Sequence, residues 1–503
     1  MIACGMLLSN AHVASASPMF ELLGDSTGDG GLAGRFTGPG PLSAYFNPAL
    51  LAQAKAQFSL GLVLLYDDID IALSPRSKNG KADISLAASG AFHGDGDVRP
   101  VTPPPLPTEW LQDGCDADCD ARLVESPARA RPRQGQDSSH QTTPYVSIGM
   151  VTPLVPKRLV LGLALLLPTT QLTGGDAFEV DEREQYFSNS LHPELYSDRL
   201  APLSLAVGLG SQLVDALSIG VSFTLGLTNS ARAPTFVPDA RAYDKLSLDS
   251  KVSVAPSLAP HFGVCFTPIE HLALTATLHT VQALEVDAAF GSFLPDGSEQ
   301  FASRRFTHHY LPLIAGLGAS YELSFGTEHA LTMLAGGTFT RWSSYRDRHD
   351  HRPSGAYAWS DTLSPTAGLR YRLRRWEAAL DATLAATPVP DQTGRTNYVD
   401  NTRLGFAPAA HYRFELFGAS MRAGLGMQLH RLLPRSQTKL VPKAGDGRDD
   451  LVRDEVPDDA VEKLNIDQAV VPRDGLQTNN PGFPGFRSEG WLFAGSASLE
   501  LLL

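Results

Sequence analysis

Residues 216–227 read Ala-Leu-Ser-Ile-Gly-Val-Ser-Phe-Thr-Leu-Gly-Leu, and this stretch decides the fold. Every second residue from Leu217 to Leu227 is large and apolar, and the residues between them are small or polar. Because strand side chains alternate between the two faces of a sheet, this pattern predicts one apolar and one polar face. The run covers twelve residues, whereas strands of globular proteins usually have about 5–6. The length favours a strand that spans a membrane.

The same alternation recurs along the chain. We predict fourteen strands, near residues 56–73, 144–153, 158–168, 200–212, 216–231, 250–266, 271–288, 303–323, 329–345, 360–373, 375–387, 402–414, 417–431 and 489–503. The links after even-numbered strands are brief and those after odd-numbered strands are long, which is typical of outer-membrane barrels. We therefore predict an all-β fold over residues 56–503, a transmembrane antiparallel β-barrel in the bacterial outer membrane.

Composition agrees with this class. Of 503 residues, 41 are Lys or Arg and 54 are Asp or Glu, so the net charge of −13 argues against a nucleic-acid partner. The longest apolar run, residues 159–167, has nine residues, whereas a membrane-spanning helix needs about 20. Aromatic residues near predicted strand ends fit the interfacial girdles of a barrel; they are Tyr310, Trp342, Tyr345, Trp359, Trp376 and Trp491.

The first residues indicate export. Residues 1–16 end in Ala14-Ser15-Ala16, a small-residue cleavage pattern, and we interpret them as the tail of an export signal. Cys115 and Cys119 lie in an acidic stretch and could close a small disulfide ring in an oxidising compartment, or simply belong to a solvated loop. Their surroundings match neither zinc nor calcium spacing, so we predict no metal site.

Residues 17–55 do not alternate and are rich in glycine. Side chains fill a barrel of about eight strands, so a fourteen-stranded one must hold water or a plug. We predict that this segment folds inside the lumen as a plug; the alternative is a disordered periplasmic tail.

Several motifs resemble one family. Residues 32–38 (Leu-Ala-Gly-Arg-Phe-Thr-Gly) and 44–51 (Ala-Tyr-Phe-Asn-Pro-Ala-Leu-Leu) resemble the N-terminal hatch of FadL-type outer-membrane transporters of long-chain fatty acids and aromatic hydrocarbons. Further segments look similar to that family in order and spacing: 339–345, 359–362, 387–391, 400–403 and 489–493. The chain departs from the pattern at its end, Leu501-Leu502-Leu503, where such barrels usually finish on an aromatic residue.

The resemblance implies passive uptake of hydrophobic molecules such as fatty acids or aromatic hydrocarbons. Long outer loops would capture the molecule, a lumenal pocket would receive it, and hatch movement would release it through the barrel wall. It implies no enzymatic step and no cofactor. The implied partners are the hydrophobic ligand, outer-membrane lipids and lipopolysaccharide, and the barrel-assembly machinery.

Two sets of site residues follow. From the hatch, Phe36, Phe46, Leu50 and Leu51 would offer apolar contact to a ligand. Asn47 and Pro48 would shape the hatch turn, either by touching the ligand or only by capping a helical turn. By alternation, four arginines face the lumen, where they could hold a carboxylate or pair with Glu377 and Asp381; they are Arg370, Arg372, Arg403 and Arg413.

Two other functions remain open. A general porin or passive surface barrel would need an open lumen. A hydrolase is suggested by His308, His309, His349 and His351, and by residues 24–28, which match the Gly-x-Ser-x-Gly pattern of a nucleophile elbow. That elbow needs a preceding strand and a following helix, which the glycine-rich surroundings do not predict.

Overall fold

The structure is a computed structural model that describes residues 18–25, 31–36, 38–74, 136–156, 158–169, 191, 193–196, 204–226, 229–237, 246–254, 257–293, 299–326, 328–347, 350–440, 480 and 482–503. The predicted export signal, the Cys115–Cys119 pair and His349 lie outside these residues. Within the described ranges, no helix has both the length and the apolar character to cross a membrane.

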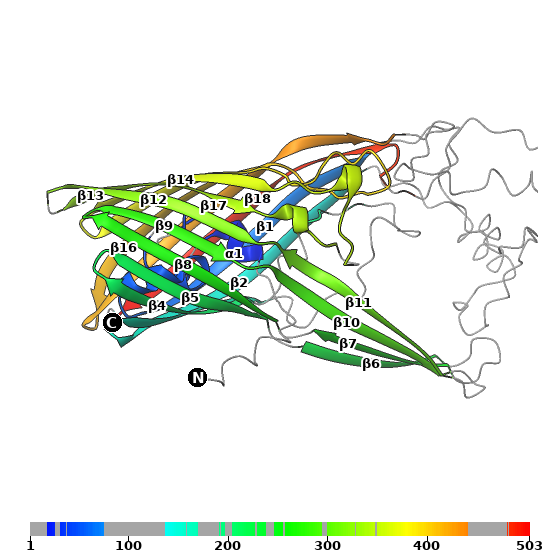
Figure 1. The fold of residues 1–503 in the computed structure, drawn as a ribbon, viewed down its shortest axis with the longest axis horizontal. Coiled ribbons are helices and arrows are strands. Elements are labelled where there is room, and N and C mark those ends of the chain that lie inside the picture. The colour runs from blue at the N-terminus through cyan, green and yellow to red at the C-terminus, as the bar shows by residue number, and fades with distance from the viewer. Residues whose placement is uncertain are drawn as a thin grey trace, which may run out of the picture.

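Fourteen strands close a barrel, as predicted (Figure 1). Each pairs antiparallel with its neighbours, and the first strand pairs with the last over its whole length. In chain order they are β1 (Gln57–Leu73), β2 (Gln136–Val155), β3 (Leu159–Pro168), β4 (Ser204–Val214), β5 (Leu217–Gly226), β8 (Ser257–Ile269), β9 (Leu272–His279), β12 (Ile314–Phe325), β13 (His329–Thr340), β14 (Thr362–Leu373), β15 (Trp376–Ala385), β16 (Arg403–Leu416), β17 (Ala419–Thr438) and β18 (Gly485–Leu502).

Four further strands form a separate sheet that leaves the barrel at its long-loop end (Figure 1). They are β6 (Asn229–Val237), β7 (Leu246–Val254), β10 (Gln282–Phe293) and β11 (Glu299–Leu311). Four strands predicted as continuous, near 216–231, 250–266, 271–288 and 303–323, are therefore each broken in two. Between β11 and β12 the break falls at Pro312, which has no N–H to donate to a ladder.

The barrel is apolar outside, and its inner wall mixes polar, small and apolar residues. On β5, Phe223 is 38% exposed, whereas its neighbour Ser222 is fully buried. On β14 the outward Leu363 is 67% exposed. A lipid-facing surface must be apolar, and only a closed sheet satisfies every backbone group there. The barrel therefore has the surface of a membrane-spanning protein.

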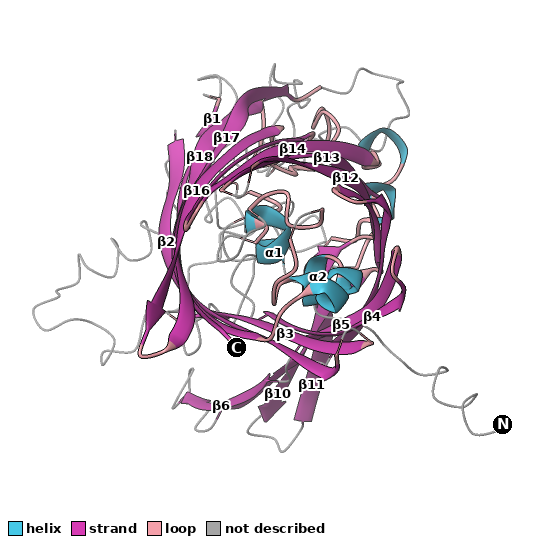
Figure 2. Cartoon of the chain, turned by 90° about the vertical axis from the view of Figure 1, so that its left-hand side faces the viewer, coloured by secondary structure: helices cyan, strands magenta, loops and turns pink. Residues whose placement is uncertain are grey.

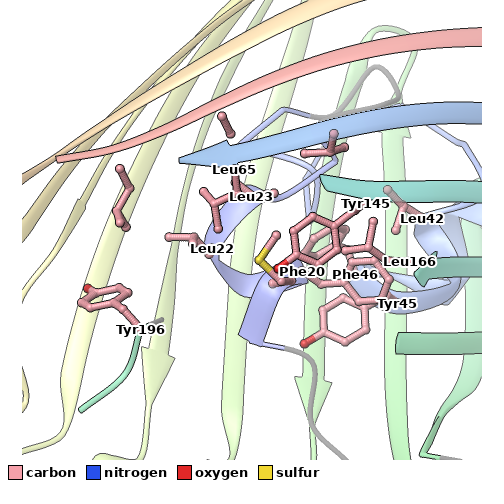
Figure 3. Packing of buried hydrophobic residues seen from close by; sticks show 14 of the residues in the cluster. Phe20, Leu22, Leu23, Leu42, Tyr45, Phe46, Leu65, Tyr145, Leu166 and Tyr196 are labelled. Carbon is pink, nitrogen blue, oxygen red and sulfur yellow. The ribbon is translucent and has the colours of Figure 1, made fainter. Parts of the chain in front are cut away.

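The described part of residues 18–54, called the lumenal segment below, lies inside the barrel (Figure 2). It contains α1 (Pro18–Leu23), α2 (Ser43–Phe46) and the 3-10 helix η1 (Pro48–Gln53). Phe20 of α1 and Tyr45 and Phe46 of α2 are buried together, with ring centroids 4.7–6.5 Å apart. The cluster continues onto the inner wall through Tyr145 and Leu166 (Figure 3).

Glycines on the inner wall let this segment approach the strand backbones. A Cβ on Gly220 would lie 2.2 Å from the carbonyl carbon of Pro48, and one on Gly210 would lie 2.5 Å from its oxygen. Leu51 fills the space left by Gly162. The small inward residues of the alternating strands thus form the seat of η1.

The predicted aromatic girdles need a correction. Tyr310, Tyr345 and Trp359 are buried in one cluster rather than facing lipid. Tyr345 and Trp359 stack in parallel with centroids 3.6 Å apart, and Tyr398 meets both rings edge-on. Tyr345, Trp359 and Tyr398 lie in long connections between barrel strands, and Tyr310 lies on β11 of the separate sheet, so their neighbours are protein side chains. Trp376, at the short-turn end, is 57% exposed and does fit a girdle.

Candidate functional site

The lumenal segment lies between two cavities. The long-loop cavity, of about 160 Å³, opens among the strand ends that carry long connections. The short-turn cavity, of about 830 Å³, is lined by the turns at Asp215 and Glu270. Arg35 lines the first cavity and the next residue, Phe36, lines the second. The segment therefore separates the two spaces.

The long-loop cavity gathers residues from distant parts of the chain. The lumenal segment contributes Glu21, Leu22, Leu32 and Arg35, and the connection after β3 contributes Leu195 and Tyr196. The family-like motifs converge here too; their lining residues are Thr340, Trp342, Thr362, Pro388, Asp400, Asn401 and Arg403. This convergence makes the long-loop cavity the candidate ligand site.

One anchor joins α1 to the rest of the segment and to the wall. The Glu21 carboxylate forms an ion pair with Arg35 and accepts a 2.8 Å hydrogen bond from the Tyr45 hydroxyl. His279 of β9 lies against the same carboxylate, with its Nδ1 3.4 Å from Glu21 Oε1. Its Nε2 lies 3.1 Å from the carbonyl oxygen of Phe46. This buried network ties α1, α2 and the barrel together.

A second anchor involves one of the predicted arginines. Arg370 of β14 makes a two-pronged ion pair with Asp381 of β15, with N···O distances of 2.5 and 3.0 Å. Asp381 Oδ2 also accepts a 3.1 Å hydrogen bond from the backbone N–H of Ala33. Both side chains are buried. The pair thus presents a fixed carboxylate to the lumenal segment.

The other three arginines differ in surroundings. Arg413 lies 3.6 Å from Glu377, and Arg372 lies 3.5 Å from Glu322. Both line the short-turn cavity, as Arg370 does. Arg403 lines the long-loop cavity instead. The four residues are therefore not one site.

Of the six predicted hatch residues, only two line either cavity. Phe36 and Leu50 line the short-turn cavity. Asn47 caps η1, because its Oδ1 accepts a 3.1 Å bond from the N–H of Ala49, and Pro48 is the first residue of that helix. Phe46 and Leu51 are buried in the main hydrophobic cluster. These last four residues line neither of the two cavities described above.

Asp400 is a site residue that sequence reasoning did not single out, although it lies in a quoted motif. It is 3% exposed, and burial raises the pKa of its carboxyl to about 6. A hydrogen bond from the Thr387 hydroxyl and the positive charges of Arg435 and Arg403 oppose that rise in the pKa. The carboxyl therefore changes its charge at a higher pH than an ordinary aspartate does.

The residues that suggested a hydrolase can be placed only in part. His309 lines the long-loop cavity, while Ser26 of the Gly-x-Ser-x-Gly stretch lies outside the described residues. Among the residues that the structure describes, no three His, Cys, Asp or Glu side chains gather to hold a metal.

Comparisons with known proteins bear on the fold. No family model and no curated sequence matches the chain. A solved structure of a Pseudomonas aeruginosa FadL homologue matches 97% of this chain and 99% of its own, with 14% identity and a TM-score of 0.50. The toluene transporters TodX of P. putida (11% identity, TM-score 0.47) and TbuX of Ralstonia pickettii (11%, 0.41) each match 98% of this chain and 99% of theirs.

The chain thus has the fold of a FadL-type barrel, as its motifs implied. A closed fourteen-stranded barrel with an apolar exterior spans the bacterial outer membrane.

Proposed function

We propose that this chain is a FadL-type channel for passive uptake of hydrophobic molecules across the outer membrane. The observation that carries the proposal is the position of the lumenal segment between two cavities, with Arg35 lining one and Phe36 the other. A hydrophobic ligand held in the long-loop cavity rests on this segment. Displacing the segment opens a path onward.

The contacts of the segment support a movable hatch. Its apolar side chains rest on a wall of glycines, and the two anchors described above are polar and local. No ATP or covalent step is needed, because the ligand moves down its concentration gradient.

The proposed exit is lateral, through the barrel wall into the membrane. The short-turn cavity is lined by many charged residues, among them Lys55, Glu270, Arg372 and Glu377. A hydrophobic molecule entering it would strip water from charges without replacing their hydrogen bonds, which is costly. Release into lipid avoids that cost.

A reversible lock tests the proposal. Ala49 of η1 belongs to the same small hydrophobic cluster as Cys265 of β8, a free and buried thiol. An Ala49→Cys variant places a second thiol in that cluster, and oxidation to a disulfide would tie η1 to the wall. We expect uptake of radiolabelled oleate or toluene by cells to fall to background when the variant is oxidised and to return on reduction. Mass spectrometry of the purified protein verifies the bond.

The double variant Ala49→Cys with Cys265→Ala is the matched control and should be insensitive to oxidant. Unchanged uptake by the locked protein would contradict hatch movement. If the locked protein also admitted small hydrophilic solutes, a general porin would be the better description.

A further inference from the structure

The long-loop cavity has the size of one small ring. Its volume is about 160 Å³, close to the ~150 Å³ cavity that holds benzene in an engineered protein core. Single-ring ligands of similar volume differ in their polar groups, so the residues that line the cavity determine which of them binds most tightly.

One wall is a ladder of hydroxyl groups. In the register of β13 and β14, Thr340 lies opposite Thr362 and Thr338 lies opposite Ser364. On the next pair of strands Thr366 lies opposite Thr383, with their hydroxyl oxygens 3.0 Å apart. All six residues line the cavity. The Thr366 and Thr383 hydroxyls already bond to each other, and that of Thr383 also donates to the carbonyl oxygen of Pro365. A pure hydrocarbon would therefore strip water from the other four hydroxyls, those of Thr338, Thr340, Thr362 and Ser364, without replacing its hydrogen bonds.

Buried charged groups on the other sides also keep unused hydrogen-bonding atoms. Arg35 is 7% exposed, and its Nη1 makes no hydrogen bond to another protein atom. The same holds for Oδ1 of Asp400 and Nε of Arg403. Such atoms are costly to bury unless a ligand or water satisfies them. All three belong to side chains that line the cavity, and because the atoms themselves are covered they add unpaired polarity to its wall rather than exposed donors and acceptors.

The charges around the cavity balance. Glu21 and Asp400 oppose Arg35 and Arg403. A carboxylate would gain little net attraction here, whereas a neutral hydroxyl group could both donate to and accept from the wall.

Resting on the proposed function, we propose that the long-loop cavity selects neutral single-ring molecules that carry a hydroxyl group, of the phenol type. Hydrocarbons of the same size and ring carboxylates bind there more weakly.

Three probes with one skeleton test this: p-cresol, toluene and p-toluate. Their binding to the purified full-length protein in detergent is measured by isothermal titration calorimetry at neutral pH, with a detergent-only blank. We expect p-cresol to bind at least about tenfold more tightly than either other probe, the effect of one net hydrogen bond of ~1.4 kcal/mol. Equal or tighter binding of toluene or p-toluate would overturn the inference.

Isosteric variants locate the preference. Thr340→Val and Thr362→Val each remove one hydroxyl of a facing pair, and we expect weaker p-cresol binding with toluene binding unchanged or tighter. The matched control is Thr332→Val. Thr332 lies on β13 with Thr340 but lines the short-turn cavity, so this variant should leave p-cresol binding unchanged. Equal effects of Thr340→Val and Thr332→Val would refute the assignment.

These outcomes are separable from those of the disulfide lock. If the disulfide lock blocks uptake but the protein binds the three probes equally well, the channel proposal is supported and the proposed ligand class is wrong. A clear p-cresol preference with a lock that has no effect would support the site and contradict hatch movement.

Discussion

Replacing Asp381 with Ala should loosen the lumenal segment. The substitution removes the acceptor of the Ala33 N–H and leaves the buried guanidinium of Arg370 without its two-pronged partner. A hydrogen bond to a charged group contributes ~1.5–3 kcal/mol. Since each ~1.4 kcal/mol is a factor of ten, the population with a displaced segment should rise about ten- to a hundredfold.

The assay is single-channel recording of the refolded barrel in a planar bilayer, with open probability as the readout. Asp381→Asn keeps a side-chain oxygen for Ala33 and should have a smaller effect. Glu328→Ala removes an exposed ion pair to Arg374 at a turn, 2.8 Å long, and should have none. An Asp381→Ala open probability within about twofold of the unmodified protein would refute the anchor, since that is under ~0.5 kcal/mol.

Three further substitutions test other parts of the account. Leu51→Ala leaves a cavity at the glycine seat and should cost the seated segment ~2–5 kcal/mol, seen as faster proteolysis of that segment. Gly220→Val places a Cβ 2.2 Å from Pro48 and should raise open probability, whereas Gly495→Val, where a Cβ meets nothing within 4 Å, should not. Because the Asp400 pKa is raised from 3.8 to about 6, the folded state holds the extra proton, so the free energy of unfolding should fall as pH rises through that window. Thermal melts of the unmodified protein and of Asp400→Asn should differ by this contribution to the slope; the same slope in both proteins would contradict the assignment.

Alternation was sufficient to predict the barrel because lipid constrains one face of every strand over its whole length. Leu217 to Leu227 shows the pattern, and the strand count was confirmed. The breaks that create β6, β7, β10 and β11 were not predicted. Residues 310–317 contain no charged or amide side chain, so the sequence shows no change of pattern at Pro312, where the ladder is interrupted. A face pattern alone therefore cannot locate where a strand changes sheets.

The site was less predictable, for physical reasons. The hydroxyl ladder could have been found, because Thr338 and Thr340 lie two apart on the polar face of one strand. The pairing of Glu21 with Arg35 could not, since neither lies in a repeating pattern and only the folded segment brings them together. Tyr345 and Trp359 were assigned to lipid because sequence does not show which loops cover a strand end.

The central claim is that residues 18–54 close the lumen, and conductance tests it most directly. The refolded full-length barrel is recorded in a planar bilayer beside a variant lacking these residues, with circular dichroism and heat-modifiable migration confirming that both form barrels. The account predicts a silent full-length protein and steady conductance after the deletion. An openly conducting full-length protein would contradict it.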